Sequence, residues 1–175
     1  LRLDNLKASI PKAQRFMALP QGDFLRVLSL GYRQVVADLL WLQTAQMMGE
    51  KTVSKESGRW IFHALDVATT LDPKFVMAYE AGGIALSTMV VLPDASNALL
   101  EKGMRNNPEE WKLPFMLGIN YYFEFQDDAK AAHYIAQASR LPGAPEYLAR
   151  LAARLYASAR EPQTAIDLLA QVYEH

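Results

Sequence analysis

Histidines and paired carboxylates are the side chains of this sequence whose types could support chemistry. The three histidines, His63, His133 and His175, do not stand in a familiar metal-binding spacing with a second ligand. Adjacent carboxylates occur at Glu109-Glu110 and Asp127-Asp128, where helices are predicted to begin. Acidic groups stabilise the dipole at a helix start. The pattern therefore predicts structural roles for all of these groups.

The sequence also lacks the motifs that mark common catalytic sites. It has no cysteine, which excludes disulfides, thiolate metal sites and cysteine nucleophiles. It contains no phosphate-binding loop, no dinucleotide-binding glycine fingerprint, no HExxH and no GxSxG. We therefore expect no catalytic residue, no cofactor, no metal and no enzymatic activity.

Composition and charge favour one globular domain. The 175 residues are 51% hydrophobic and 21% charged, enough for a hydrophobic core. A net charge of −1 gives no general attraction to nucleic acid. The longest apolar run, residues 84–92, is too short to span a bilayer. The chain begins at Leu1 rather than Met, which leaves open an absent upstream anchor or targeting segment.

Apolar residues recur at steps of three and four, which is typical of helices. Residues 1–30 are expected to form a basic N-terminal arm with a short helix, and residues 31–175 a single helical domain. Pro73, Pro108 and Pro142 are 35 and 34 residues apart. We expect each proline to follow a capping residue and to open the next helix. The expected helices cover about residues 23–30, 32–48, 59–71, 74–89, 94–105, 109–125, 127–140, 145–159 and 162–174.

Two of these helices carry a clear apolar pattern. In the helix at 59–71, the expected buried stripe consists of Trp60, Ile61, Ala64, Leu65 and Ala68. In the helix at 32–48, the expected apolar side consists of Val35, Val36, Leu39, Leu40, Trp41 and Leu42. Arg33 and Asp38 lie within that side, where an ion pair or a contact with a loop is their expected role.

Glycines keep the same spacing as the prolines. Gly49, Gly83 and Gly118 are 34 and 35 residues apart. A glycine at the crossing of two helices lets their backbones approach closely. A period near 34 residues with two helices in each unit is typical of a helical repeat.

The third unit carries the pattern in full, with Leu117-Gly118 and Tyr121 on its first helix and Ala131, Ile135, Ala138 and Pro142 after them. In these positions the sequence resembles the tetratricopeptide repeat (TPR) family, from about Tyr32 to the C-terminus. The last unit has Ala153 in place of the glycine. The resemblance implies an all-α fold, a right-handed α-solenoid of about four helical hairpins.

The resemblance further implies that the first helices of successive hairpins line a concave groove. With each first helix set in register by its glycine, the predicted partner-binding residues are Met77, Ile84, Phe115, Ile119, Tyr122, Tyr147, Arg150 and Arg154. The middle of this surface is apolar and its end is basic.

Such a groove suits a scaffold or assembly subunit that binds an amphipathic or hydrophobic segment of a partner protein. Two alternatives stay open. The chain is a fixed accessory subunit of a larger complex, tethered to a membrane through an absent N-terminal anchor. Or the groove is filled permanently, by residues 1–30 or by a neighbouring subunit.

Overall fold

The computed structural model describes residues 19–29, 31–49 and 54–173. The described residues are all-helical and contain no strand. The helices are α2 (Gly22–Leu28), α3 (Arg33–Met48), α4 (Lys55–Leu71), α5 (Val76–Ile84), the π-helix η2 (Ala85–Met89), α6 (Pro93–Asn106), α7 (Lys112–Phe123), α8 (Asp128–Ser139), α9 (Tyr147–Ser158) and α10 (Pro162–Tyr173).

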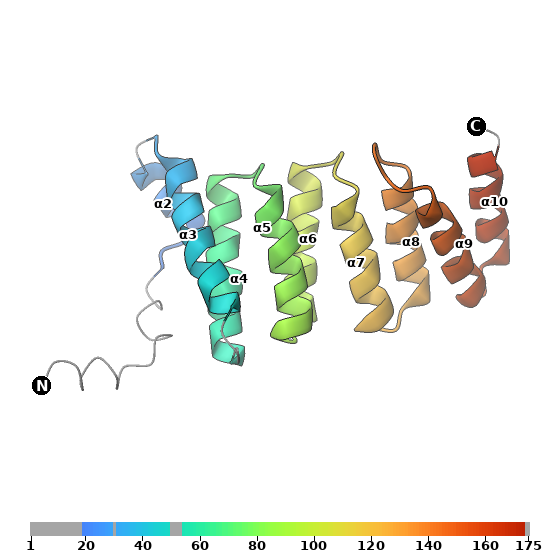
Figure 1. Cartoon of the computed structure of the whole chain (residues 1–175), viewed down its shortest axis with the longest axis horizontal. Coiled ribbons are helices and arrows are strands. Elements are labelled where there is room, and N and C mark those ends of the chain that lie inside the picture. The colour runs from blue at the N-terminus through green and yellow to red at the C-terminus, as the bar shows by residue number, and fades with distance from the viewer. Residues whose placement is uncertain (1–18, 30, 50–53, 174–175) are drawn as a thin grey trace, which may run out of the picture.

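These helices stand side by side in chain order along the longest axis of the molecule (Figure 1). Most of them pack chiefly on the helices that precede and follow them in the sequence. In the view of Figure 1, α3, α5, α7 and α9 form the row nearer to the viewer, with α4, α6 and α8 behind them. Each helix therefore needs an apolar stripe for its neighbours.

The core consists of three clusters in succession along this row. The first joins α3 to α4, the second joins α4 to α7, and the third joins α8 to α10. The stripe expected on α4 is confirmed, because Ile61, Ala64 and Leu65 are fully buried. Tyr121 of α7 packs against the second and third clusters and stacks on Tyr134, with ring centroids 5.4 Å apart. The hydrophobic core is thus continuous from α4 to α10.

Glycine at the predicted crossings is explained by close packing. A Cβ atom at Gly118 would lie 2.6 Å from Cγ1 of Ile135 and 3.0 Å from the carbonyl oxygen of Ala131. Gly83 faces Leu100 in the same way, at 2.8 Å. Gly49 behaves differently, because it caps the C-terminus of α3 and lies at no crossing. The first member of the glycine series is therefore a helix end, as its place directly after the expected helix at residues 32–48 predicts.

The regular spacing reappears in turns that have no glycine. Val91, Gln126 and Arg160 have positive φ angles of 56°, 53° and 64°, and they are 35 and 34 residues apart. Each sits between two consecutive helices: η2 and α6, α7 and α8, and α9 and α10. The amide after Val91 donates to the carbonyl of Leu86, and the amide after Gln126 donates to that of Tyr121. Both bonds reach back six residues and close the end of the preceding helix. At Arg160 the amide of Glu161 donates to the carbonyl of Tyr156, five residues back, and the amide of Arg160 donates to that of Ala157, as in a Schellman motif.

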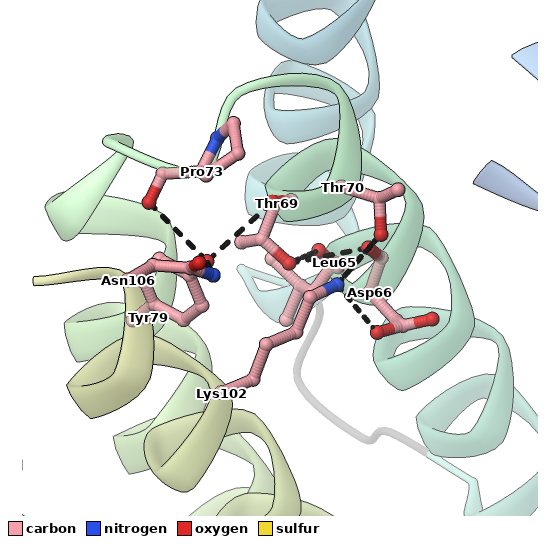
Figure 2. Close-up of polar contacts among 8 residues, drawn as sticks. All are labelled: Leu65, Asp66, Thr69, Thr70, Pro73, Tyr79, Lys102 and Asn106. Atoms are coloured by element: carbon pink, nitrogen blue, oxygen red, sulfur yellow. Dashed lines mark hydrogen bonds and ion pairs between the residues drawn. The ribbon is translucent and has the colours of Figure 1, made fainter. Parts of the chain in front are cut away.

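Polar contacts connect the helices of the second row and the turns beside them (Figure 2). Nζ of Lys102, on α6, lies 2.7 Å from three acceptors on α4: the carbonyl oxygen and Oδ1 of Asp66, and Oγ1 of Thr70. The buried hydroxyl of Tyr79 accepts a bond from Asn106 and lies 3.4 Å from the carbonyl oxygen of Pro73. All three ammonium protons of Lys102 are used, which fixes α6 against α4.

Two expectations about helix ends are wrong. Helix α4 begins at Lys55, earlier than residue 59, because the Ser54 side chain accepts a bond from the Ser57 amide and caps it. Asp72 and Asn107 close the preceding helices instead of capping the following ones, and α5 starts only at Val76. Prolines at positions 73 and 108 therefore lie in the turns. Pro162 does stand first in its helix, α10.

The face that α3 buries also differs from the expectation. Its buried residues are Ala37, Leu40 and Thr44. The side chains of Val35, Leu39 and Leu42 are instead 53%, 59% and 55% exposed. Arg33 and Asp38 are exposed as well, so they form no buried ion pair. Both faces of α3 are apolar, which the sequence alone could not divide into a packed face and a free one.

Candidate functional site

Five of the eight predicted partner-binding residues line two neighbouring clefts on α5, η2, α7 and α9. These five are Ile84, Phe115, Ile119, Tyr122 and Arg154. The other three, Met77, Tyr147 and Arg150, are exposed but line neither cleft. The structure therefore brings together the central part of the predicted set and leaves its two ends outside.

The first cleft lies between the α5–η2 segment and α7 and has a volume of about 380 Å³. Its walls are mostly apolar, with Ile84 on one side and Phe115 and Ile119 on the other. Leu100 of α6 also contributes. Polar groups enter from Ser87, Thr88, Asn120 and Glu124. The first cleft thus offers an apolar pocket with a few polar atoms, as binding sites usually do.

The second cleft lies between α7 and α9, beside the start of α8, and has a volume of about 440 Å³. Ile119 and Phe123 line both clefts, so α7 forms a ridge between them. Tyr122 and Leu151 add apolar surface to the second cleft, and Arg154 and Asp128 add opposite charges. The two clefts therefore form one continuous surface, which we call the α7 groove.

The shape of the α7 groove depends on how α7 is held. Gly118 sets the distance between α7 and α8. Asp127 accepts a bond from the Lys130 amide at 2.9 Å and so fixes the start of α8. In the first cleft the π-helix turns the hydroxyls of Ser87 and Thr88 back to the carbonyls of Gly83 and Ile84. These hydroxyls are satisfied internally, and the apolar side chains dominate the cleft.

A buried polar network supports the floor of the first cleft. The side-chain Nδ2 of Asn120 donates to Oγ of Ser96 at 2.8 Å and to Oδ1 of Asn97 at 2.9 Å. Ser96 in turn donates to the carbonyl of Gly83 at 2.7 Å. Because buried polar groups are costly unless they are paired, this network fixes α5, α6 and α7 relative to one another. The groove is therefore built on a rigid base.

Charges around the groove are nearly balanced. Nζ of Lys112 lies 3.2 Å from Oε1 of Glu80, although not in hydrogen-bonding geometry, so α7 and α5 are joined by a simple ion pair. In the second cleft, Arg154 shares the wall with Asp128. A partner segment of either net charge meets neither strong attraction nor strong repulsion here, and apolar contact must supply most of the affinity.

The histidines of the described residues and the buried Tyr79 lie outside the α7 groove. Nε2 of His63 is 3.0 Å from the carbonyl oxygen of Leu19, and the ring of His133 contacts Tyr134. Within the described residues no group of three or more His, Asp and Glu side chains is placed to hold a metal ion. Burial raises the pKa of the Tyr79 hydroxyl, which lies among hydrogen-bonded helix ends and not in the groove. The groove itself offers surface for binding.

Phe123 is the main groove residue that the sequence prediction missed. Its ring is 65% exposed and lines both clefts. The register taken from Gly118 selected Tyr122 at this end of the helix. The signal was nevertheless present, because Phe123 is four residues after Ile119 and lies on the same helix face. Met116 and Leu151 were missed as well.

No protein-family model, no protein of curated function and no solved structure matches this chain. None of the helices in the described part of the chain combines the length and the apolar character needed to cross a membrane.

Proposed function

We propose that this chain is a TPR-like right-handed α-solenoid of about four hairpins that acts as a protein–protein interaction scaffold or assembly subunit. Its partner segment, amphipathic or hydrophobic, binds in the α7 groove. The observation that carries the proposal is the pair of apolar clefts on either side of α7, with Ile119 and Phe123 shared between them. Chain-order packing and the regular left-handed turns support the repeat architecture.

Surface chemistry favours a protein partner. Three exposed apolar side chains line the groove, Ile84 at 50%, Tyr122 at 41% and Phe123 at 65% exposure. Contiguous apolar surface of this kind marks interaction sites. Aromatic side chains beside a pocket supply much of the binding energy at protein interfaces. Nucleic acid is a poor candidate, because the chain carries a net charge of −1.

The test is selection of groove-binding peptides from a displayed random peptide library. The full chain is the bait, and Phe123→Glu is the variant for counter-selection. Phe123 is exposed, so the fold tolerates the change while a charge enters both clefts. We expect selected peptides to carry apolar residues at helical spacing and to bind Phe123→Glu at least tenfold more weakly.

Ile166→Glu is the matched control, because Ile166 is 59% exposed on α10 and lines neither cleft. Peptide affinity should be unchanged in this variant. Tyr122→Ala should weaken binding through the second cleft alone. Phe115→Ala is less informative, because Phe115 also packs on the core beside Trp111. Peptides that bind Phe123→Glu as well as the wild type, or a failure to enrich any peptide, would overturn the proposal.

A further inference from the structure

Among the described residues, helix α3 carries a second exposed apolar surface. Val35, Leu39 and Leu42 are all more than half exposed on α3, and we call them the α3 stripe. The stripe lies on the side of α3 opposite to the buried Ala37 and Leu40, because residues two apart on a helix point about 200° apart. An apolar stripe on a helix is normally covered by a neighbour.

The α3 stripe has the form of a ligand for the α7 groove. Its residues follow the i, i+4, i+7 spacing by which an amphipathic helix anchors in a groove. Val35 and Leu42 are seven residues apart, about 10.5 Å along the helix axis. The two clefts flank one helix, α7, so a docked helix that crosses α7 meets both of them.

We infer that the α3 stripe of one copy of this chain docks into the α7 groove of a second copy. Val35 and Leu42 enter the two clefts, and Leu39 lies over Ile119 between them. The inference rests on the proposed function, since it names an occupant for the same groove. It requires a second copy because α3 and α7 stand in the same row of a single chain, with α5 between them (Figure 1).

Charge permits the contact. Asp38 lies beside the stripe on α3, and Arg154, of opposite charge, lines the second cleft. The whole chain carries a net charge of −1, so two copies repel each other only weakly. The two surfaces are different, so the contact is heterologous. It leaves one stripe and one groove free at the ends of every assembly, which then grows or closes into a ring.

The test uses the full chain in sedimentation-velocity and light-scattering measurements at concentrations from about 1 μM to about 1 mM, a range that spans weak protein association. The weight-average mass should rise with concentration beyond that of two copies. Leu39→Glu, which spoils only the stripe, and Phe123→Glu, which spoils only the groove, should each be monomeric. Both positions are exposed, and unchanged circular dichroism verifies the fold. Ile166→Glu should associate like the wild type.

Mixing the two variants gives the decisive measurement. Leu39→Glu keeps an intact groove and Phe123→Glu keeps an intact stripe, so the mixture should form a species of two copies and nothing larger. If Phe123→Glu associates with itself, the stripe pairs with another stripe and the inference is wrong. A wild-type chain that stays monomeric also overturns it. Peptide binding in the groove is measured separately. If it is observed while the wild-type chain stays monomeric, the inference of self-association is wrong and the proposed function still holds.

Discussion

Three residues with bulky side chains, Val91, Gln126 and Arg160, hold the left-handed backbone conformation that glycine adopts most easily. Val91 is the extreme case, because a β-branched side chain crowds the backbone at positive φ. It lies two residues after the end of the π-helix that lines the first cleft. Its side chain is 60% exposed, so packing does little to offset the strain.

Val91→Gly should therefore stabilise the protein. The left-handed conformation costs a residue with a side chain about 1–2 kcal/mol. Replacement by glycine removes this cost, but glycine loses more conformational entropy on folding, which offsets part of the gain. A net gain of about 1 kcal/mol corresponds to a rise in Tm of about 2–4 °C for a chain of this size. Differential scanning calorimetry measures it. Val90→Gly is the control and should lower Tm, because Val90 is buried. An unchanged or lower Tm for Val91→Gly would show that the backbone at Val91 is not strained.

Pairs of helices are held by apolar stripes and by a few polar contacts at fixed places. Lys102 is the clearest of these contacts, since its side chain is 20% exposed and its ammonium group meets three acceptors on α4. Asp66 remains 46% exposed, so the ion pair itself adds little. The value of Lys102 lies mainly in its bonds to the Asp66 carbonyl and to Thr70.

Lys102→Met should lower the free energy of unfolding by about 1–2 kcal/mol. The substitution keeps most of the aliphatic chain and removes the ammonium donors, so the loss reports on the hydrogen bonds. Urea unfolding followed by circular dichroism measures it. Lys55→Met, at an exposed position in the first turn of α4, should change stability by less than about 0.5 kcal/mol. Equal effects of the two changes would show that the contact in Figure 2 contributes nothing.

Across the whole molecule, the free energy of unfolding should decrease at alkaline pH. The pKa of Tyr79 is raised above its ordinary value near 10, mainly because burial disfavours the phenolate. The phenols of Tyr134 and Tyr156 are shifted in the same direction, also by burial. The stability gained by keeping these groups neutral is fully present below pH 10. It is lost as pH rises from there through the folded-state pKa, because the unfolded chain releases protons first.

The free energy of unfolding should therefore fall above about pH 10, with a slope of up to about 1.4 kcal/mol per pH unit for each such group. Tyr79→Phe should be less stable at neutral pH, since the hydrogen bond with Asn106 is lost. Its alkaline decline should nevertheless be shallower than that of the wild type. Urea unfolding between pH 8 and pH 11 compares the two slopes. Identical slopes would mean that Tyr79 ionises equally in both states.

At the scale of helices, much of the fold was predictable from the sequence. Periodic apolar residues located the helices of the described part, and steric need explains Gly83 and Gly118. Helix starts were predicted less well, because Asp72-Pro73 and Asn107-Pro108 carry the composition of a helix start yet form a helix end followed by a turn. Local sequence patterns do not decide whether such a residue caps the helix before it or the helix after it.

The sequence by itself determined the helical periodicity and the close crossings at Gly83 and Gly118, because these follow from the spacing of side chains along one helix. The groove residues Ile84, Phe115, Ile119 and Tyr122 came from the resemblance to the TPR family, and their role in partner binding stays a prediction. Tertiary structure decided which face of each helix is covered. That choice made Phe123 part of both clefts and left the α3 stripe exposed, because burial depends on neighbouring helices that lie far away in the sequence.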